Sequence, residues 1–332
     1  DMVSSLRILK NVCDEQELRC SKMTFDERTE TMSVFLPSMS AQIKSIFESY
    51  SHKIGHLIDI EKIPQDTAYH RLFQEHIYPY LKSSDLSRRA SEKPRGYDGD
   101  YEMMNQVYRQ SFEGSDLMGK VIHHYSINSE TNESVQFRRP YFLSNMESAL
   151  DRPGAKKFLS VASGPAFEVQ DAVSRWPQQT IDRTHFVLFD LDREALEHAQ
   201  TKILEIAMDK NKNPNVDYIN ASVKSFLNHQ EDAAESFDLI YSGGLFDYLD
   251  NLTSTMITRS LFRLLKPQGR LVIGNFTKAV GTKSFISLIL RWHLIYKTEE
   301  EMRAWAADLQ GCKVSVDYDP NHINAFLVIE KK

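Results

Sequence analysis

Two short stretches of the sequence have the composition of a ligand-binding site. The first, FLSVASGPAFEVQDAV (158–173), is an apolar run, a turn of small residues around Gly164, and then a helical pattern. The second, FVLFDLD (186–192), is an apolar run that ends on Asp190 and Asp192. A strand, a small-residue loop, a helix and a second strand tipped by a carboxylate form the half-site that binds a nucleoside in a doubly wound sheet. The sequence therefore predicts a nucleoside site between Gly164 and Asp190.

The elements that must position this site alternate along the second half of the chain. Apolar runs predict strands over 157–162, 185–190, 216–220, 237–242 and 270–276. Helical patterns separate them over 168–176, 193–209, 222–229 and 253–265. This alternation predicts a parallel sheet with helices on both faces. Residues 312–332 show two strand-like alternations joined by a turn at 319–321, which predicts a terminal antiparallel hairpin.

The first half of the chain has a different pattern. Apolar residues recur at helical spacing over 34–58 and 66–81, and a polar stretch broken by Pro and Gly follows over 82–100. We therefore predict a helical cap and substrate domain over residues 1–150 and a cofactor-binding domain over residues 151–332. For residues 1–80 two roles remain open, an extension of the cap or the interface of a homodimer.

A parallel sheet that ends in an antiparallel hairpin resembles the fold of the S-adenosylmethionine-dependent methyltransferases. The loop 162–166 resembles their G-x-G-x-G loop, with Gly164 kept and alanine at both outer positions. FDLIYSGGLFDYLDN (237–251) resembles their fourth-strand motif, and LLKPQGRLVIGNF (264–276) keeps the usual Pro-x-Gly turn. The resemblance implies an α/β Rossmann-like doubly wound sheet with a terminal hairpin, and S-adenosyl-L-methionine as the cofactor.

The resemblance also implies roles for individual residues. Asp190 would accept hydrogen bonds from both ribose hydroxyls, since two carboxylate oxygens match a cis-diol. Asn220 would bind the adenine amino group, and the small-residue loop would hold the methionine moiety. Asp192 fits better as the N-cap of the following helix. The implied cofactor-binding residues are Ala162, Ser163, Gly164, Pro165, Asp190, Leu191, Asn220, Ala221, Ser242, Gly243 and Phe246.

A narrower resemblance covers roughly residues 90–332. The segments at 93–108, 119–142 and 291–305 are similar to bacterial proteins for the biosynthesis of 3-hydroxypalmitic acid methyl ester. This similarity implies methyl transfer to the carboxylate of a hydroxy fatty acid. Methyl transfer is an in-line displacement that depends mainly on positioning. A carboxylate acceptor needs no base because it is already ionised at pH 7, whereas an amine or hydroxyl needs one.

Candidate catalytic and substrate residues come from these segments and from the end of the fourth strand. The catalytic candidates are His123, His124, Asp247 and Tyr248. The substrate-binding candidates are Tyr97, Tyr101, Tyr125, Arg138, Arg139, Trp292, His293 and Tyr296. Arginine suits a carboxylate because its guanidinium can bind both oxygens. Simpler roles remain open for these residues, such as structural histidines, solvated helix charges and helix packing. No His, Asp and Glu set has ligand spacing, so no metal is expected.

Composition narrows the classes of partner. The net charge of −6 and the pI near 6.0 argue against nucleic acid as the main partner, because phosphate binding needs a basic face. Three cysteines without a cluster predict unpaired thiols in a reducing, cytoplasmic compartment. The sequence has no apolar run of about 18 residues, so insertion into a membrane is not expected.

Three functions are compatible with these features, and all of them use a small molecule as substrate or ligand. The first is methyl transfer to an acyl carboxylate. The second is N-, S- or O-methylation of another small metabolite, with a histidine or acid as base. The third is a non-catalytic cofactor-binding scaffold, suggested by Ala162 and Ala166 in place of glycine. A nicotinamide-dependent oxidoreductase fits less well, since a pyrophosphate-binding loop needs its glycines more.

Overall fold

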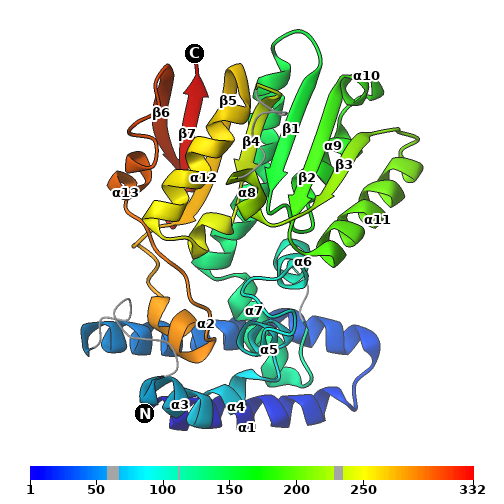
Figure 1. Cartoon of the computed structure of the whole chain (residues 1–332). Coiled ribbons are helices and arrows are strands. Elements are labelled where there is room, and N and C mark those ends of the chain that lie inside the picture. Colours follow the sequence, from blue (N-terminus) through cyan, green and yellow to red (C-terminus); the bar gives the residue numbers. More distant parts are fainter. Residues whose placement is uncertain (58–66, 111–112, 228–234) are drawn as a thin grey trace. The chain divides into compact units, whose positions relative to one another are not determined.

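The computed structural model describes residues 1–57, 67–110, 113–227 and 235–332, which form two compact units (Figure 1). The helical unit comprises residues 1–133 and 280–293, and the sheet unit comprises residues 134–279 and 294–332. The division differs from the predicted one at residue 150, since most of helix α8 (Glu130–Leu150) belongs to the sheet unit. It differs again at 280–293, a segment that leaves the sheet after its last parallel strand and folds with the N-terminal helices.

The sheet unit is built on seven strands. They are β1 (Lys156–Val161), β2 (Thr184–Asp190), β3 (Asn215–Asn220), β4 (Phe237–Ser242), β5 (Leu265–Phe276), β6 (Cys312–Tyr318) and β7 (Asn324–Lys331). Their order is β3-β2-β1-β4-β5-β7-β6. Strands β1 to β5 are parallel to one another, and β7 pairs antiparallel with both β5 and β6. The predicted doubly wound sheet with a terminal hairpin is therefore confirmed.

Helices cover both faces of this sheet (Figure 1). The sheet unit contains α9 (Phe167–Arg175), α10 (Gln178–Asp182), α11 (Arg193–Asp209), α12 (Asn251–Leu264), α13 (Glu299–Ala304) and the short turns η2 (Val223–Leu227) and η3 (Leu245–Tyr248). One face of the sheet packs against α8, α9 and α11, and the other packs against α12 and α13. Successive strand residues serve opposite faces, as Phe158 and Leu159 of β1 do. Both are buried, which explains why the strands read as continuous apolar runs.

Two details separate the observed elements from the predicted ones. The helix predicted over 222–229 is the 3₁₀ turn η2, and residues 228 and 229 lie outside the described part. The Pro-x-Gly turn lies within β5, where the register against β4 shifts and Gln268 takes a φ of 63°. Gly269 is needed there because a Cβ would lie 2.8 Å from the Lys266 carbonyl oxygen.

The helical unit has no strand among its described residues. Its helices are α1 (Met2–Cys20), α2 (Phe25–Leu57), α3 (Ala68–His76), α4 (Tyr78–Leu81), α5 (Asp85–Glu92), α6 (Tyr101–Arg109), α7 (Leu117–Ile127), the start of α8, and the π-helical turn η4 (Phe285–Ile289). The predicted positions 58 and 66 lie outside the described residues. The segment 280–293 joins this unit through the Phe285 ring, which lies 4.4 Å from that of Phe47 on α2.

Candidate active site

The loop between β1 and α9 has an unusual backbone. Ala162, Gly164 and Ala166 all have positive φ angles, of 55°, 51° and 50°. These are the three positions at which the G-x-G-x-G pattern has glycine, so the loop keeps a glycine-like backbone with alanine side chains. A left-handed conformation costs a non-glycine residue about 1–2 kcal/mol. Such strain is typical of functional sites, because the surrounding structure must hold it in place.

Ser163 and Asp190 provide polar atoms beside this loop. The Gly164 N–H donates to Asp190 Oδ2 at 2.8 Å, and the Asp192 N–H donates to Asp190 Oδ1 at 2.9 Å. Burial raises the pKa of the Asp190 carboxyl, and backbone donors from Asp192, Gly164 and Leu191 oppose the rise. The Ser163 hydroxyl is buried and has no hydrogen-bond partner among the described residues. A carboxylate held by backbone donors and an unpaired hydroxyl beside it are suited to hold a polar ligand.

Asn220 and Leu191 extend the site along the ends of β2 and β3. The Asn220 side-chain amide donates to the carbonyls of Asp190 at 3.1 Å and Leu191 at 2.8 Å. It therefore ties the end of β3 to the β2–α11 loop and leaves its own oxygen as an acceptor. Ala221 donates its N–H to the Asp190 carbonyl. The Leu191 side chain is 70% exposed, so this edge presents an apolar surface beside polar groups. Asp192 caps α11 through the Glu194 N–H, as its spacing predicts.

The end of β4 is closely packed around its backbone. Ser242 Oγ donates to the Val161 carbonyl at 2.9 Å, which joins β4 to β1. A Cβ on Gly243 would lie 3.3 Å from the Phe142 ring, and one on Gly244 would lie 3.1 Å from Arg138 Nη1. Gly274 of β5 must also lack a side chain, since a Cβ there would lie 2.7 Å from the Gly243 carbonyl oxygen. The backbone at the end of β4 is therefore packed too closely for side chains at these glycines without a shift of their neighbours.

Phe246 lies elsewhere than expected. Its side chain has no exposed surface, and its ring packs 5.5 Å from that of Trp305 in the core. A cofactor cannot touch this ring without rearrangement of the core. The physical reason is that η3 turns Phe246 toward α12 and α13 rather than toward the loop end of the sheet.

Arg138 and Asp247 form a buried pair next to Gly244. Arg138 Nη2 lies 3.1 Å from Asp247 Oδ2, and its Nε donates to Asn324 Oδ1 at 3.1 Å. The other Asp247 oxygen accepts the Phe276 N–H at 2.6 Å. Burial raises the pKa of Asp247 to about 6, and the positive charge of Arg138 opposes this rise. Asp247, predicted to be catalytic, therefore has both carboxylate oxygens engaged, and it positions the Arg138 guanidinium. The Nη1 atom of Arg138 faces Gly244.

Arg139 is engaged in a different way. Its Nε and Nη2 donate to the two carboxylate oxygens of Asp171 on α9, at 2.7 and 2.6 Å. The guanidinium also lies 5.0 Å from the centre of the Phe167 ring. This pairing uses the same nitrogens that a substrate carboxylate would need, so Arg139 joins α8 to α9 in this structure.

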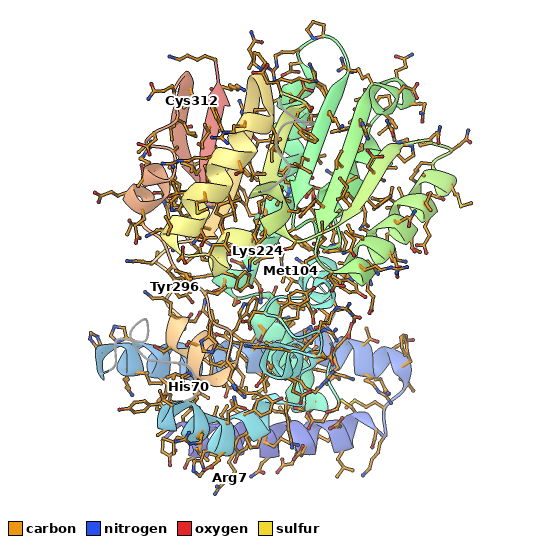
Figure 2. All side chains as sticks on the ribbon, viewed as in Figure 1. Arg7, His70, Met104, Lys224, Tyr296 and Cys312 are labelled. Atoms are coloured by element: carbon orange, nitrogen blue, oxygen red, sulfur yellow. The ribbon has the colours of Figure 1, made fainter. Side chains whose placement is uncertain are left out.

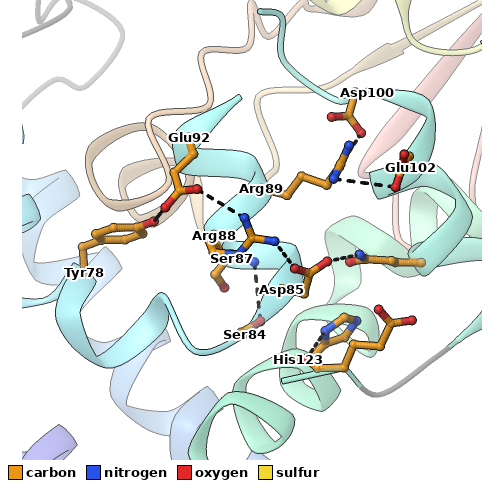
Figure 3. Close-up of polar contacts among 12 residues, drawn as sticks. Tyr78, Ser84, Asp85, Ser87, Arg88, Arg89, Glu92, Asp100, Glu102 and His123 are labelled. Atoms are coloured by element: carbon orange, nitrogen blue, oxygen red, sulfur yellow. Dashed lines mark hydrogen bonds and ion pairs between the residues drawn. The ribbon is translucent and has the colours of Figure 1, made fainter. Parts of the chain in front are cut away.

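The predicted histidine bases belong to the helical unit, in α7. The His123 side chain has no exposed surface, and its Nδ1 lies 2.6 Å from the Glu113 carbonyl oxygen (Figure 3). Burial lowers the pKa of His123 and of its neighbour His124, so both rings favour the neutral form. Direct contact of His123 with a substrate would require α7 to move. His124 is only partly buried.

The remaining predicted residues divide between the two units. Tyr97 is 39% exposed in the helical unit, and Tyr101 begins α6, with the Arg95 guanidinium 5.0 Å from its ring centre. Tyr125 and Trp292, far apart in sequence, line one cavity of the helical unit. Burial, with nearby positive charges, lowers the pKa of His293 to about 4. Tyr248 and Tyr296 belong to the sheet unit, where Tyr296 (Figure 2) is buried and Tyr248 is 36% exposed.

Sequence reasoning missed two residues of this site. Asn324, the first residue of β7, accepts from Arg138, and Asp319 Oδ1 accepts the Asn324 N–H at 2.7 Å. The second residue is Phe142, whose ring would lie 3.3 Å from a Cβ on Gly243. The sequence offers only the weak signal that a polar residue opens an otherwise apolar terminal strand.

The described residues show neither a metal-binding cluster nor a membrane-spanning helix. No group of three or more His, Cys, Asp or Glu side chains among them is arranged to hold a metal ion. None of their helices combines the length and apolar character needed to cross a membrane.

Comparison with solved structures finds similar chains at low sequence identity. A possible exported protein from Bordetella parapertussis is 16% identical with a TM-score of 0.55, and the match covers 74% of this chain and 94% of that one. The CurJ carbon methyltransferase is 12% identical (TM-score 0.47; 70% and 58% covered). Magnesium protoporphyrin IX methyltransferase from Synechocystis PCC 6803 with bound SAH is 9% identical (TM-score 0.45; 61% and 88% covered).

No curated protein matches the sequence. A family described as "Methyltransferase domain" matches residues 154–324. The match begins just before β1, includes the strained loop, Asp190 and Asn220, and ends at the first residue of β7. They make up just over half of the chain, and the protein therefore belongs to the methyltransferase-domain family of enzymes.

Proposed function

We propose that the protein transfers a methyl group from S-adenosyl-L-methionine to the carboxylate of a small acid. The observation that carries the donor assignment is the loop 162–166, where two alanines hold glycine-like φ angles beside Asp190. Strain of this kind needs a reason, and close approach of a ligand to the loop backbone supplies one.

The residues present fit an adenosyl ligand. The Asp190 oxygens can accept further hydrogen bonds from the ribose hydroxyls, and the Asn220 oxygen is open to the adenine amino group. Leu191 offers apolar surface for the adenine ring. The Ser163 hydroxyl has no hydrogen-bond partner among the described residues. The methionine end of the donor would provide one. Bound there, the donor supplies an electrophilic methyl group on a sulfonium.

Arg138 supports an acid as the acceptor. Its Nη1 faces Gly244 at the end of β4, while Asp247 and Asn324 hold the other side of the guanidinium. With Nε and Nη2 engaged, Nη1 is the atom that would bind and orient one carboxylate oxygen, and orientation supplies much of the rate in a displacement reaction. A hydroxy fatty acid is the acceptor that agrees both with this arginine and with the resemblance of segments 93–108, 119–142 and 291–305. The carboxylate oxygen would take the methyl group, and no proton would need to move.

The acceptor assignment is tested by product formation. Purified enzyme is incubated with the donor and a panel of fatty acids, 3-hydroxy fatty acids, amines and thiols, and S-adenosylhomocysteine and methyl esters are quantified. We expect ester formation with the acids, and a loss of at least tenfold in Arg138→Met. Binding of S-adenosylhomocysteine should persist in that variant. Turnover with amines or thiols alone would overturn the proposal.

The second candidate, transfer to an amine, thiol or hydroxyl, needs a base. One observation favours it: burial lowers the pKa of His124 and keeps the ring in the neutral form that a base requires. In that case His124→Ala would abolish turnover and leave donor binding intact. The acceptor contacts predicted for Tyr97, Tyr101, Tyr125, Trp292 and His293 remain predictions.

We further propose that the reaction takes place in the cytoplasm on a free small molecule. The three cysteines are unpaired in the structure, as a reducing compartment favours. The net charge of −6 does not favour nucleic acid as a substrate.

A further inference from the structure

The helical unit contains a cavity of its own, and Tyr125 and Trp292 are among the residues that line it. Its volume is about 40 Å³, and its walls come from α5, α6, α7, the start of α8 and the segment 282–292. A water molecule needs roughly 10–15 Å³ on this scale, so the cavity has room for about three waters or a group of similar size. All of its lining residues are uncharged, which favours a neutral occupant.

One polar atom of the cavity wall lacks a partner. Ser87 is 1% exposed, and its Oγ has no hydrogen bond among the described residues. Its N–H donates to the Ser84 hydroxyl at 3.4 Å, which fixes the start of α5 (Figure 3). Around this hydroxyl the wall is mainly apolar, with Leu86, Met103 and Ile286. A buried hydroxyl without a partner is unfavourable, and a ligand oxygen in the cavity would satisfy it.

Another part of the cavity wall has a specialised backbone. Residues Phe285–Ile289 form a π-helical turn, and Arg291 follows with a φ of 53°. The Trp292 N–H then donates to the Ile286 carbonyl at 3.0 Å, so both residues contribute to the same wall. π-helical turns and left-handed non-glycine residues carry a folding cost and occur often at ligand sites. The strain and the unpaired hydroxyl are independent observations at one cavity.

We propose that this cavity binds a small neutral group, mainly apolar, with one oxygen that hydrogen-bonds to Ser87 Oγ. A C3–C4 alcohol or ketone, or the end of a larger molecule with that chemistry, has the required size and polarity. The assignment concerns the helical unit alone and does not depend on methyl transfer.

The test uses the full chain and two probes, 2-propanol and xenon. Ligand-observed NMR titration gives the dissociation constant of the alcohol, expected to be on the order of millimolar for so few atoms. Crystals exposed to each probe show where it binds. Ser87→Ala removes the hydroxyl and keeps the shape of the cavity. Ala90→Leu fills the cavity from the next turn of α5, and Ala90→Val is the milder form if leucine prevents folding.

We expect 2-propanol in the wild-type cavity with its oxygen within hydrogen-bond distance of Ser87 Oγ. Ser87→Ala should bind the alcohol about tenfold more weakly and retain xenon, and filling at Ala90 should remove both. The proposal is overturned if Ser87→Ala binds the alcohol as tightly as the wild type. It is equally overturned if the wild-type cavity holds only water in the presence of the alcohol, or if the alcohol binds at crystal concentration only.

Discussion

The strained alanines are the residues through which the loop at 162–166 can be tested most simply. Ala162 is exposed with a φ of 55°, so glycine there should relieve strain without loss of packing. We expect Ala162→Gly to raise the free energy of unfolding by about 0.5–1 kcal/mol, after the entropy cost of glycine. Chemical denaturation measures this change.

Ala166→Gly is the matched control. Ala166 has nearly the same φ but is 1% exposed and packs in the core, so its lost methyl contacts offset the relief of strain. We expect a smaller gain than at Ala162, or none. A clear loss of stability in Ala162→Gly would show that the alanine backbone is not strained there.

Asp247 should make stability depend on pH in a defined direction. Burial raises the pKa of this carboxyl from 3.8 to about 6, so the folded state holds its proton more tightly than the unfolded state does. Stability contributed by the protonated form is therefore lost as pH rises through this window. Relative to Asp247→Asn, the wild type should lose on the order of 2–3 kcal/mol between pH 4 and pH 7. Denaturation of both proteins across that range is the measurement, and parallel pH profiles would contradict the expectation.

Single residues also show how far sequence could predict the site. Small residues at 162–166 and an acid at the end of a predicted strand are local patterns, so Gly164 and Asp190 could be identified and lie together. The partners of Arg138 and Arg139 could not, because Asn324 and Asp171 are remote in sequence and nothing local marks them. Phe246 was misplaced because an aromatic residue after β4 can face either the ligand or the core.

Among the elements, strands β4 and β5 approach each other so closely that residue 274 must be glycine. A Cβ on Gly274 would lie 2.7 Å from the Gly243 carbonyl oxygen, too close for either strand to absorb without a shift. We expect Gly274→Ala to lower the free energy of unfolding by about 1–3 kcal/mol and to weaken donor binding. Denaturation and calorimetry with S-adenosylhomocysteine measure the two effects.

Gly281→Ala is the control for this substitution. A Cβ at Gly281 would meet no atom within 4 Å, and its φ is not in the left-handed region. Its stability should stay within about 0.5 kcal/mol of the wild type. Equal effects of the two alanines would mean that the approach of Gly243 to Gly274 does not matter.

Elements with a clear period were predictable, and those set by remote contacts were not. The helix predicted over 193–209 has those limits as α11, because Asp192 caps it and its apolar residues recur at helical spacing. Residues 222–229 read as helix but form a 3₁₀ turn where described. The segment 280–293 carried no sign that it would fold with helices more than 200 positions earlier, a contact exemplified by Ser51 and Gly281.

The discontinuous helical unit has a consequence for the whole molecule. Phe285, Leu288 and Ile289 are buried, and they belong to the unit whose other residues lie before 134. Removal of residues 1–133 alone should therefore expose these side chains and cause aggregation. Replacing 280–293 in the same truncated protein with a Gly/Ser linker of equal length should restore a monodisperse sheet unit. Size-exclusion chromatography with light scattering compares the two proteins, and equal behaviour would contradict the assignment of 280–293.

The central claim for the whole molecule is that the sheet edge beside the loop 162–166 binds an adenosyl donor. Isothermal titration calorimetry with S-adenosylhomocysteine tests it most directly, on the wild type, Asp190→Asn and Asp192→Asn. Asparagine still caps a helix well, so the Asp192 variant keeps the fold of α11 and serves as the control. We predict one site per chain, a loss of at least about tenfold in affinity for Asp190→Asn, and unchanged affinity for Asp192→Asn. Absence of binding to the wild type, or equal binding by Asp190→Asn, would contradict the account.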